Sequence, residues 1–151
     1  GLPMTGLRFF TVYGPAGRPD MAYFQFTKAI LAGETIRVFN HGDLMRDFTY
    51  IDDIASGVLA VCEVPPTELE IPYRILNLGN NKTVRLDYFI ETLEHLLGIE
   101  AVKEYVDMQP GDVYKICANI DAAEILIGYQ PEVGIEDGLK NFVDWYVNRY
   151  Q

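Results

Sequence analysis

The chain has 151 residues, enough for one domain with a sizeable core, and its apolar content of 49% and charged content of 23% are ordinary for a globular protein. The formal net charge of −10 makes a nucleic-acid backbone an unfavourable partner. The sequence has no signal peptide, basic targeting run or membrane-spanning stretch, so we expect a soluble, cytoplasmic protein with no membrane partner.

The first predicted element is a buried strand over residues 6–13, an apolar run rich in Phe and Val. Gly and Pro residues break the following stretch into a rigid loop over 14–19, whose one cation is Arg18. Asp20 is the expected N-cap of a helix over 20–33. In α/β folds, a loop that connects a strand to the following helix is a common place for a ligand to bind. The guanidinium of Arg18 in such a loop could form a bidentate contact with a carboxylate or a phosphate. The alternative is a solvated loop charge.

Strand-like and helix-like segments continue to alternate along the chain, which favours an α/β fold. Strands or extended segments are predicted at 36–39, 48–50, 73–78, 101–106 and 113–118, with 73–78 buried, and helices at 20–33, 52–64, 85–97, 121–127 and from 135 onward. The first helix has a stripe at helical spacing that consists of Tyr23, Phe26, Thr27, Ile30 and Leu31, and the last helix repeats apolar residues at Leu139, Phe142, Val143 and Tyr146. No repeat or long linker divides the chain, so residues 1–151 are expected to form a single compact unit.

Several polar and sulfur side chains in these elements have ordinary structural interpretations. Asp52 and Asp53 open the helix over 52–64, where carboxylates satisfy free N–H groups and suit the helix dipole. Cys62 and Cys117 lie in apolar segments and are expected to be buried free thiols. Residues 54, 58, 59 and 62 are expected to face inward. No set of residues with metal-ligand spacing is present.

A dinucleotide-binding site requires a glycine-rich turn between a strand and a helix, so that backbone N–H groups can approach the pyrophosphate. The nearest cluster is Gly14 and Gly17, with Asp20 where a third glycine would come. The sequence therefore predicts no dinucleotide site of its own.

Three segments carry a family resemblance: LRFFTVYGP followed by GRPDM over 7–21, RDFTYIDDI over 46–54, and MQPGDV over 108–113. Together they resemble the NAD-dependent nucleotide-sugar epimerases and dehydratases of the extended short-chain dehydrogenase/reductase superfamily, and most of all the UDP-glucuronate 4-epimerases. The resemblance covers the C-terminal half of such an enzyme. It implies a remnant of a Rossmann-type sheet plus a small α/β substrate-binding domain, with the N-terminal NAD-binding half absent.

In this family NAD oxidises C4 of a UDP-sugar, the 4-keto intermediate rotates, and hydride returns to the other face. The chemistry uses a Tyr as general acid/base with a Lys four residues later. None of the ten tyrosines of this chain has Lys at that spacing, so the resemblance implies that the isolated chain is inactive and holds no NAD tightly.

The resemblance also implies roles for individual residues of the site. Thr11 and Arg18 would contact the sugar, with Arg18 on the glucuronate carboxylate, and Arg46 would neutralise the diphosphate. Asp112 would bind ribose hydroxyls. The other implied contacts are Phe9 beside the nicotinamide, and Arg37, Val38 and Phe39 along the uracil, much of it through backbone.

Three interpretations therefore stay open: the UDP-sugar-binding part of an epimerase, a stand-alone nucleotide-sugar-binding module, or an oligomeric assembly protein without catalysis. A truncated sheet would leave unpaired backbone groups and bare apolar faces, so a homo-oligomer is expected.

Overall fold

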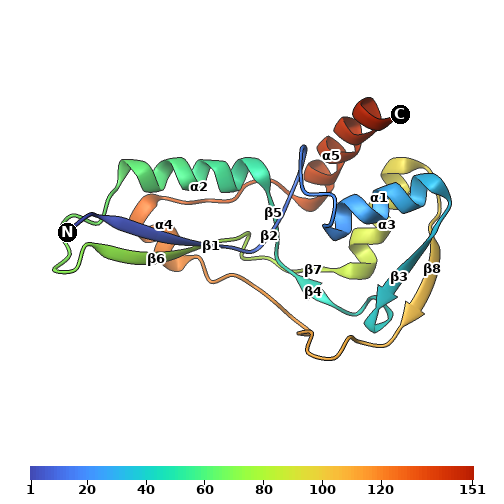
Figure 1. Cartoon of the computed structure of the whole chain (residues 1–151), viewed down its shortest axis with the longest axis horizontal. Coiled ribbons are helices and arrows are strands. Elements are labelled where there is room, and N and C mark those ends of the chain that lie inside the picture. The colour runs from blue at the N-terminus through green and yellow to red at the C-terminus, as the bar shows by residue number, and fades with distance from the viewer.

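The computed structural model describes all 151 residues and contains five α-helices, one short 3-10 helix and eight strands (Figure 1). The strands are β1 (Met4–Phe9), β2 (Thr11–Tyr13), β3 (Thr35–Phe39), β4 (Met45–Arg46), β5 (Phe48–Tyr50), β6 (Tyr73–Leu78), β7 (Val84–Arg85) and β8 (Val102–Val106). The helices are α1 (Ala22–Ala32), η1 (Asn40–Gly42), α2 (Ile51–Glu63), α3 (Leu86–Leu97), α4 (Asp121–Ile127) and α5 (Ile135–Tyr150). The predicted α/β class is confirmed.

The strands form four separate pairs, and no larger sheet is present. Three pairs are parallel, namely β1 with β6, β2 with β5 and β3 with β8, whereas β4 and β7 pair antiparallel. Each parallel pair joins strands far apart in the sequence, as parallel pairing requires a crossover connection. Figure 1 shows β1 and β6 with α2 and α4 at one end of the molecule, and α1, α3, α5, β3 and β8 at the other.

The larger hydrophobic cluster lies between α1, α3, α5 and the adjoining strands. Helix α5 contributes four residues at helical spacing, all buried as predicted: Leu139, Phe142, Val143 and Tyr146. The ring of Phe142 meets that of Tyr23 on α1 edge-to-face, with centroids 4.8 Å apart. Helices α1 and α3 end at Gly33 and Gly98, which both adopt the left-handed conformation with φ of 66°.

A close approach between β2 and α5 fixes the two elements against each other. Tyr13 is only 1% exposed, and its hydroxyl donates to the carbonyl of Gly134 at 3.2 Å. A Cβ atom at Gly138 would lie 2.1 Å from that same hydroxyl oxygen. Glycine at position 138 is therefore what allows the Tyr13 ring to lie against the helix.

The smaller cluster lies on one face of the β1–β6 pair, where α2 and α4 cover Leu76 and Leu78. The other face is uncovered, and Met4, Tyr73 and Ile75 are 51%, 46% and 43% exposed on it. The prediction that both of these strands are buried is therefore wrong. An apolar strand sequence does not reveal whether one face or both are covered.

A buried carboxylate joins three distant segments at the centre of the molecule. Asp47 is 0% exposed, and its Oδ1 accepts from the Thr49 hydroxyl at 2.9 Å and the Asn80 N–H at 2.7 Å. Its Oδ2 accepts from the N–H groups of Asn81 at 3.0 Å and Ala118 at 2.9 Å. These bonds tie the β4–β5 connection to the turn after β6 and to the segment before α4.

Asp53 has a comparable structural role, because its carboxylate accepts from the backbone N–H groups of Glu132 and Val133, both at 3.1 Å. The prediction that Asp53 caps its own helix is wrong: Tyr50 is the N-cap of α2, and no side chain caps it. Asp20 likewise caps nothing, since Met21 occupies that position in α1.

The remaining differences from the predicted elements have simple causes. The strand over 6–13 breaks at Phe10, and residues 113–118 form no strand, with only a single bridge from Lys115 to Met45. Cys62 and Leu59 are exposed, because α2 buries a narrower face than its apolar content indicated. Cys117 is exposed in the strand-free segment before α4. None of the helices combines the length and apolar composition that crossing a bilayer requires.

Candidate functional site

A cavity of about 530 Å³ opens between α1, β3 and the β4–β5 segment. Its apolar wall comes from Phe26 and Ala29 on α1 and from Phe39, Leu44, Phe48 and Leu86. Its polar groups are Thr11, Asp20, Gln25, Thr35, Arg37 and Arg46. A mainly apolar cavity with a few converging polar groups is typical of a small-molecule site.

Strand β3 contributes four of its five residues to the lining of this cavity. These are Thr35, Ile36, Arg37 and Phe39, whereas Val38 is 1% exposed and packs in the larger hydrophobic cluster. Of the predicted uracil-contacting residues, Arg37 and Phe39 can therefore present side chains. Val38 can contribute only its backbone, and its side chain does not line the cavity.

Arg46 is the best-held cation of the cavity, with a side chain that is 18% exposed. Its Nη1 donates to the carbonyls of Met45 at 3.0 Å and Tyr114 at 3.3 Å, and its Nη2 donates to Asp112 Oδ1 at 2.7 Å. A guanidinium carries five N–H donors, so the Nε–H and one Nη2–H keep no protein partner. These two donors belong to the planar fork that suits bidentate contact with a phosphate.

The two other predicted arginines are exposed and also paired with carboxylates. Arg37 Nε donates to Glu104 on the neighbouring β8 at 3.1 Å, and the Arg37 side chain is 70% exposed. Arg18 is 75% exposed and forms a bidentate pair with Asp20, at 3.0 Å through Nε and 2.5 Å through Nη2. That hydrogen bonding lowers the pKa of the Asp20 carboxyl below its usual value. An anion at any of the three arginines competes with a carboxylate.

The predicted site residues thus divide into those that line the cavity and those that do not. Thr11, Arg37, Phe39 and Arg46 line it. Asp112 lies next to it through the pair with Arg46, and Arg18 lies next to it through Asp20. Phe9 is 51% exposed on β1 and does not border the cavity.

Sequence reasoning missed the contribution of helix α1. Gln25, Phe26 and Ala29 of this helix line the cavity. The helical spacing predicts Phe26 in the stripe that faces the core, and no motif distinguishes Gln25. The only feature of the sequence that could have indicated their role is their position in the helix, one or two helical turns after the loop that contains Arg18.

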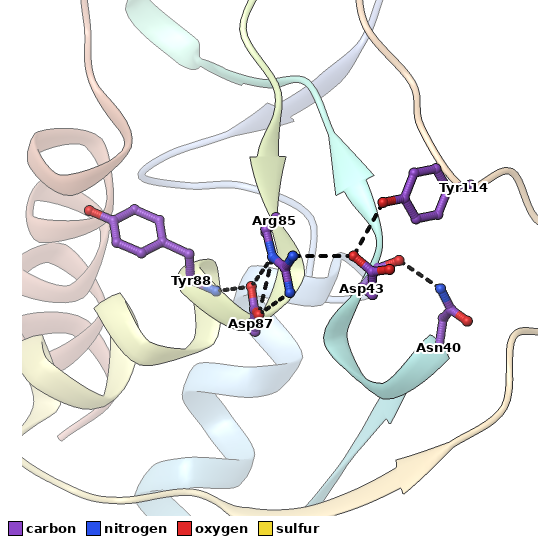
Figure 2. A network of polar contacts seen from close by, with 6 residues as sticks. All are labelled: Asn40, Asp43, Arg85, Asp87, Tyr88 and Tyr114. Atoms are coloured by element: carbon purple, nitrogen blue, oxygen red, sulfur yellow. Dashed lines mark hydrogen bonds and ion pairs between the residues drawn. The ribbon is translucent and has the colours of Figure 1, made fainter.

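A network of polar contacts holds the segment that carries Asp112 (Figure 2). The Tyr114 hydroxyl donates to Asp43 Oδ1 at 3.2 Å, and Arg85 Nη1 lies 3.3 Å from the same oxygen. Arg85 also pairs with Asp87 at 2.6 Å, and Asp87 Oδ1 accepts from the Tyr88 N–H at 2.7 Å. Hydrogen bonding from Arg85 lowers the pKa of the Asp87 carboxyl. The network therefore runs from the first turn of α3 to the unpaired segment after β8.

A second cavity of about 530 Å³ lies beside α2, but its chemistry is unsuited to an anion. Three carboxylates border it, those of Asp52, Asp53 and Glu132, and no basic side chain does. No group of three or more His, Cys, Asp or Glu side chains is arranged to hold a metal ion. The cavity with Arg46 is therefore the candidate site.

The glycines of the first motif are packed against protein side chains. A Cβ at Gly14 would lie 2.5 Å from Ile51 Cγ2, and one at Gly17 would lie 1.7 Å from the Tyr23 hydroxyl. Protein side chains therefore already occupy the space in which a Cβ atom would lie at these two positions.

Residues 1–79, just over half of the chain, match the family model described as the NAD-dependent epimerase/dehydratase family. The chain is 49% identical to protein CapI of Staphylococcus aureus, over 99% of this chain and 49% of that protein. It is 40% identical to a probable UDP-glucuronate 4-epimerase of Rhizobium meliloti, over 99% of this chain and 48% of that protein. The chain therefore spans about half the length of the curated relatives it matches.

A solved structure of similar fold is the UDP-glucuronic acid 4-epimerase from Bacillus cereus in complex with UDP-glucuronic acid and NAD. It superposes with a TM-score of 0.88 at 36% identity, over 99% of this chain and 46% of that one. The short parallel strand pairs of this chain thus correspond to part of a Rossmann-like epimerase fold, and that structure contains NAD as well as a UDP-sugar.

Proposed function

Because the chain belongs to the NAD-dependent epimerase/dehydratase family, we propose that it is the UDP-sugar-binding part of an NAD-dependent 4-epimerase acting on UDP-glucuronate. Residues 1–151 would act as one unit, the substrate-binding half of an enzyme whose NAD-binding half lies outside this sequence. The names of its relatives and the UDP-glucuronic acid in the similar solved structure support this substrate.

The observation that carries the proposal is the cavity at Arg46, whose guanidinium keeps two donors free beside an apolar wall. In this proposal the diphosphate binds Arg46, and the uracil lies along Arg37 and Phe39 with the backbone of Val38. Asp112 turns from Arg46 to the ribose hydroxyls. A phosphate that replaces the Asp112 carboxylate on Arg46 leaves that carboxylate free to bind the ribose hydroxyls. Arg46 can therefore bind the diphosphate while Asp112 binds the ribose.

The sugar would extend from the diphosphate toward Thr11, with Arg18 reaching the glucuronate carboxylate. The guanidinium of Arg18 is paired with Asp20, which lines the cavity, and in this proposal it exchanges that carboxylate for the one of the sugar. Phe9 would approach the nicotinamide of NAD in a complete enzyme. Its exposed side chain on β1 leaves room for a ligand supplied with the other half.

Catalysis by this chain alone is not part of the proposal. No tyrosine has a lysine four residues later, and the cluster of Gly14 and Gly17 has Asp20 where a third glycine would come. We expect the purified chain to bind UDP and UDP-glucuronate weakly and to leave the sugar unchanged. Calorimetry measures the binding, and NMR of the anomeric proton in the presence of NAD detects any 4-epimer. Turnover by the 151-residue chain would contradict the inactive assignment, and absence of UDP binding would contradict the site.

A second proposal concerns the uncovered face of the β1–β6 pair. Met4, Tyr73 and Ile75 are exposed there, and both outer strand edges have free backbone groups. We expect a second copy of the chain to cover this face in the isolated protein, by strand addition or face-to-face packing. Light scattering from one to one hundred micromolar protein, roughly the range over which such a weak dimer would dissociate, tests it. A clean monomer throughout would exclude the homo-oligomer.

The Ile75→Lys variant provides the matched test of which surface is used. It places a charge in the middle of the exposed face, so it should shift the protein to monomer. Ile125→Lys changes an equally apolar and more exposed residue on α4, at 82% exposure, and should leave the oligomeric state unchanged.

A further inference from the structure

Residues 107–118 have no helix or strand, yet they carry the carboxylate that contacts Arg46. Two backbone hydrogen bonds attach this segment to β4: the Met45 N–H donates to the Tyr114 carbonyl at 2.9 Å, and the Ile116 N–H donates to the Met45 carbonyl at 3.0 Å. The Tyr114 carbonyl also accepts from Arg46 Nη1 at 3.3 Å. Tyr114 is therefore the residue where the segment and the guanidinium meet.

The side chain of Tyr114 adds a third attachment. Its hydroxyl donates to Asp43 Oδ1 at 3.2 Å, although the residue as a whole is 47% exposed (Figure 2). Asp43 is held in turn by Arg85, which is fixed by Asp87 at the start of α3. Without the hydroxyl, the two backbone hydrogen bonds to Met45 would be the remaining attachments that keep the Tyr114 carbonyl on Arg46.

We propose that Tyr114 is a positioning residue for Arg46: its hydroxyl, anchored on Asp43, keeps its carbonyl on Nη1 and so aims the free fork of the guanidinium into the cavity. This inference rests on the proposed function, because it concerns how the same cavity binds a diphosphate. It adds to that function a second group of residues, Tyr114, Asp43 and Arg85, which do not line the cavity.

The orientation matters because a guanidinium gives bidentate contact only when its plane is fixed. Two of its N–H groups donate to the carbonyls of Met45 and Tyr114, and one Nη2–H donates to Asp112, which leaves the Nε–H and the second Nη2–H for the ligand. Loss of the contact with the Tyr114 carbonyl would let the guanidinium of Arg46 rotate. Its Nε–H and Nη2–H would then point less consistently toward the phosphate.

The test is Tyr114→Phe, which removes the hydroxyl alone. We expect the affinity for UDP to fall about threefold to tenfold, the value of one hydrogen bond. The matched control is Tyr105→Phe, an exposed tyrosine on β8 whose hydroxyl has no hydrogen-bond partner, and its UDP affinity should not change. Titration followed by NMR chemical shifts measures dissociation constants into the millimolar range.

A double variant separates positioning from a general structural effect. If Tyr114 acts through Arg46, Tyr114→Phe should cause no further loss in an Arg46→Ala background. An equal loss in that background, or no loss in the wild-type background, would overturn the proposal.

Amide exchange gives a readout that does not depend on UDP. Tyr114→Phe should speed exchange of the Met45 and Ile116 N–H groups, which join the segment to β4, and leave the β3–β8 pair unchanged. Should the wild-type chain fail to bind UDP, the proposed function falls, and the exchange rates still decide the positioning claim. Unchanged exchange at both amides would refute it.

Discussion

Replacing Asp47 with asparagine should lower the free energy of unfolding by about 3 kcal/mol or more, since hydrogen bonds to a charged group contribute about 1.5–3 kcal/mol each. The Asp47 carboxylate accepts four hydrogen bonds in a site with no solvent exposure. An amide of the same size has one carbonyl oxygen, and its NH2 group faces either the N–H donor of Asn80 or the N–H donors of Asn81 and Ala118. Those buried donors then have no acceptor.

Urea denaturation of the two proteins measures the difference, and Asp52→Asn is the matched control. Asp52 is in the first turn of α2 and its carboxylate makes no hydrogen bond, so its loss should cost only the helix-dipole contribution, about 0.3–1 kcal/mol. Equal midpoints for the two variants would show that the Asp47 bonds add little to stability. The wild-type structure has no buried side-chain polar atom without a partner, so the defect would be new.

Replacing Arg46 with alanine should weaken UDP, UDP-glucose and UDP-glucuronate alike, by about tenfold to a hundredfold, because a charge-assisted hydrogen bond contributes about 1.5–3 kcal/mol. The three ligands share the diphosphate, and Arg46 is the least exposed of the three arginines predicted for the site. Arg18→Ala should instead weaken UDP-glucuronate and leave UDP nearly unchanged. Calorimetry with all three ligands separates the two patterns.

Arg149→Ala is the control for loss of a positive charge in this acidic protein, because Arg149 lies in the last turn of α5 and takes no part in the cavity. If Arg18→Ala reduced the affinities for UDP and UDP-glucuronate by the same factor, Arg18 would contact phosphate or shape the loop. If Arg46→Ala lowered the affinity for UDP-glucuronate alone, Arg46 would contact the sugar carboxylate and not the diphosphate. Low salt sharpens the contrast, since exposed charges are strongly screened.

Local periodicity was enough to predict most helices and strands. The bounds of β6 and α4 match those predicted, and all four apolar residues named for α5 are buried. Their patterns depend on neighbours three or four residues away, or two in a strand, which a single sequence displays. The three motifs also identified the family, because they combine residue type with order along the chain.

The centre of the fold could not be predicted in the same way. Asp47 accepts from Asn80 and Ala118, which are 33 and 71 residues away, and no local pattern distinguishes a buried carboxylate from an exposed one. Arg18 and Asp20 illustrate the same limit in the site. Their ion pair forms across two residues, yet the sequence favoured a helix cap for one and a free cation for the other.

The contact between Tyr13 and Gly138 has a consequence for how the sequence can diverge. The ring and the missing side chain fill one shared volume, so the two positions should change together or not at all. In a library randomised at both, selection for folded protein should recover a large residue at 13 with glycine at 138, or a smaller residue at 13 with alanine at 138. Variants with a large residue at both positions should be eliminated, although a large residue at 13 is acceptable with glycine at 138.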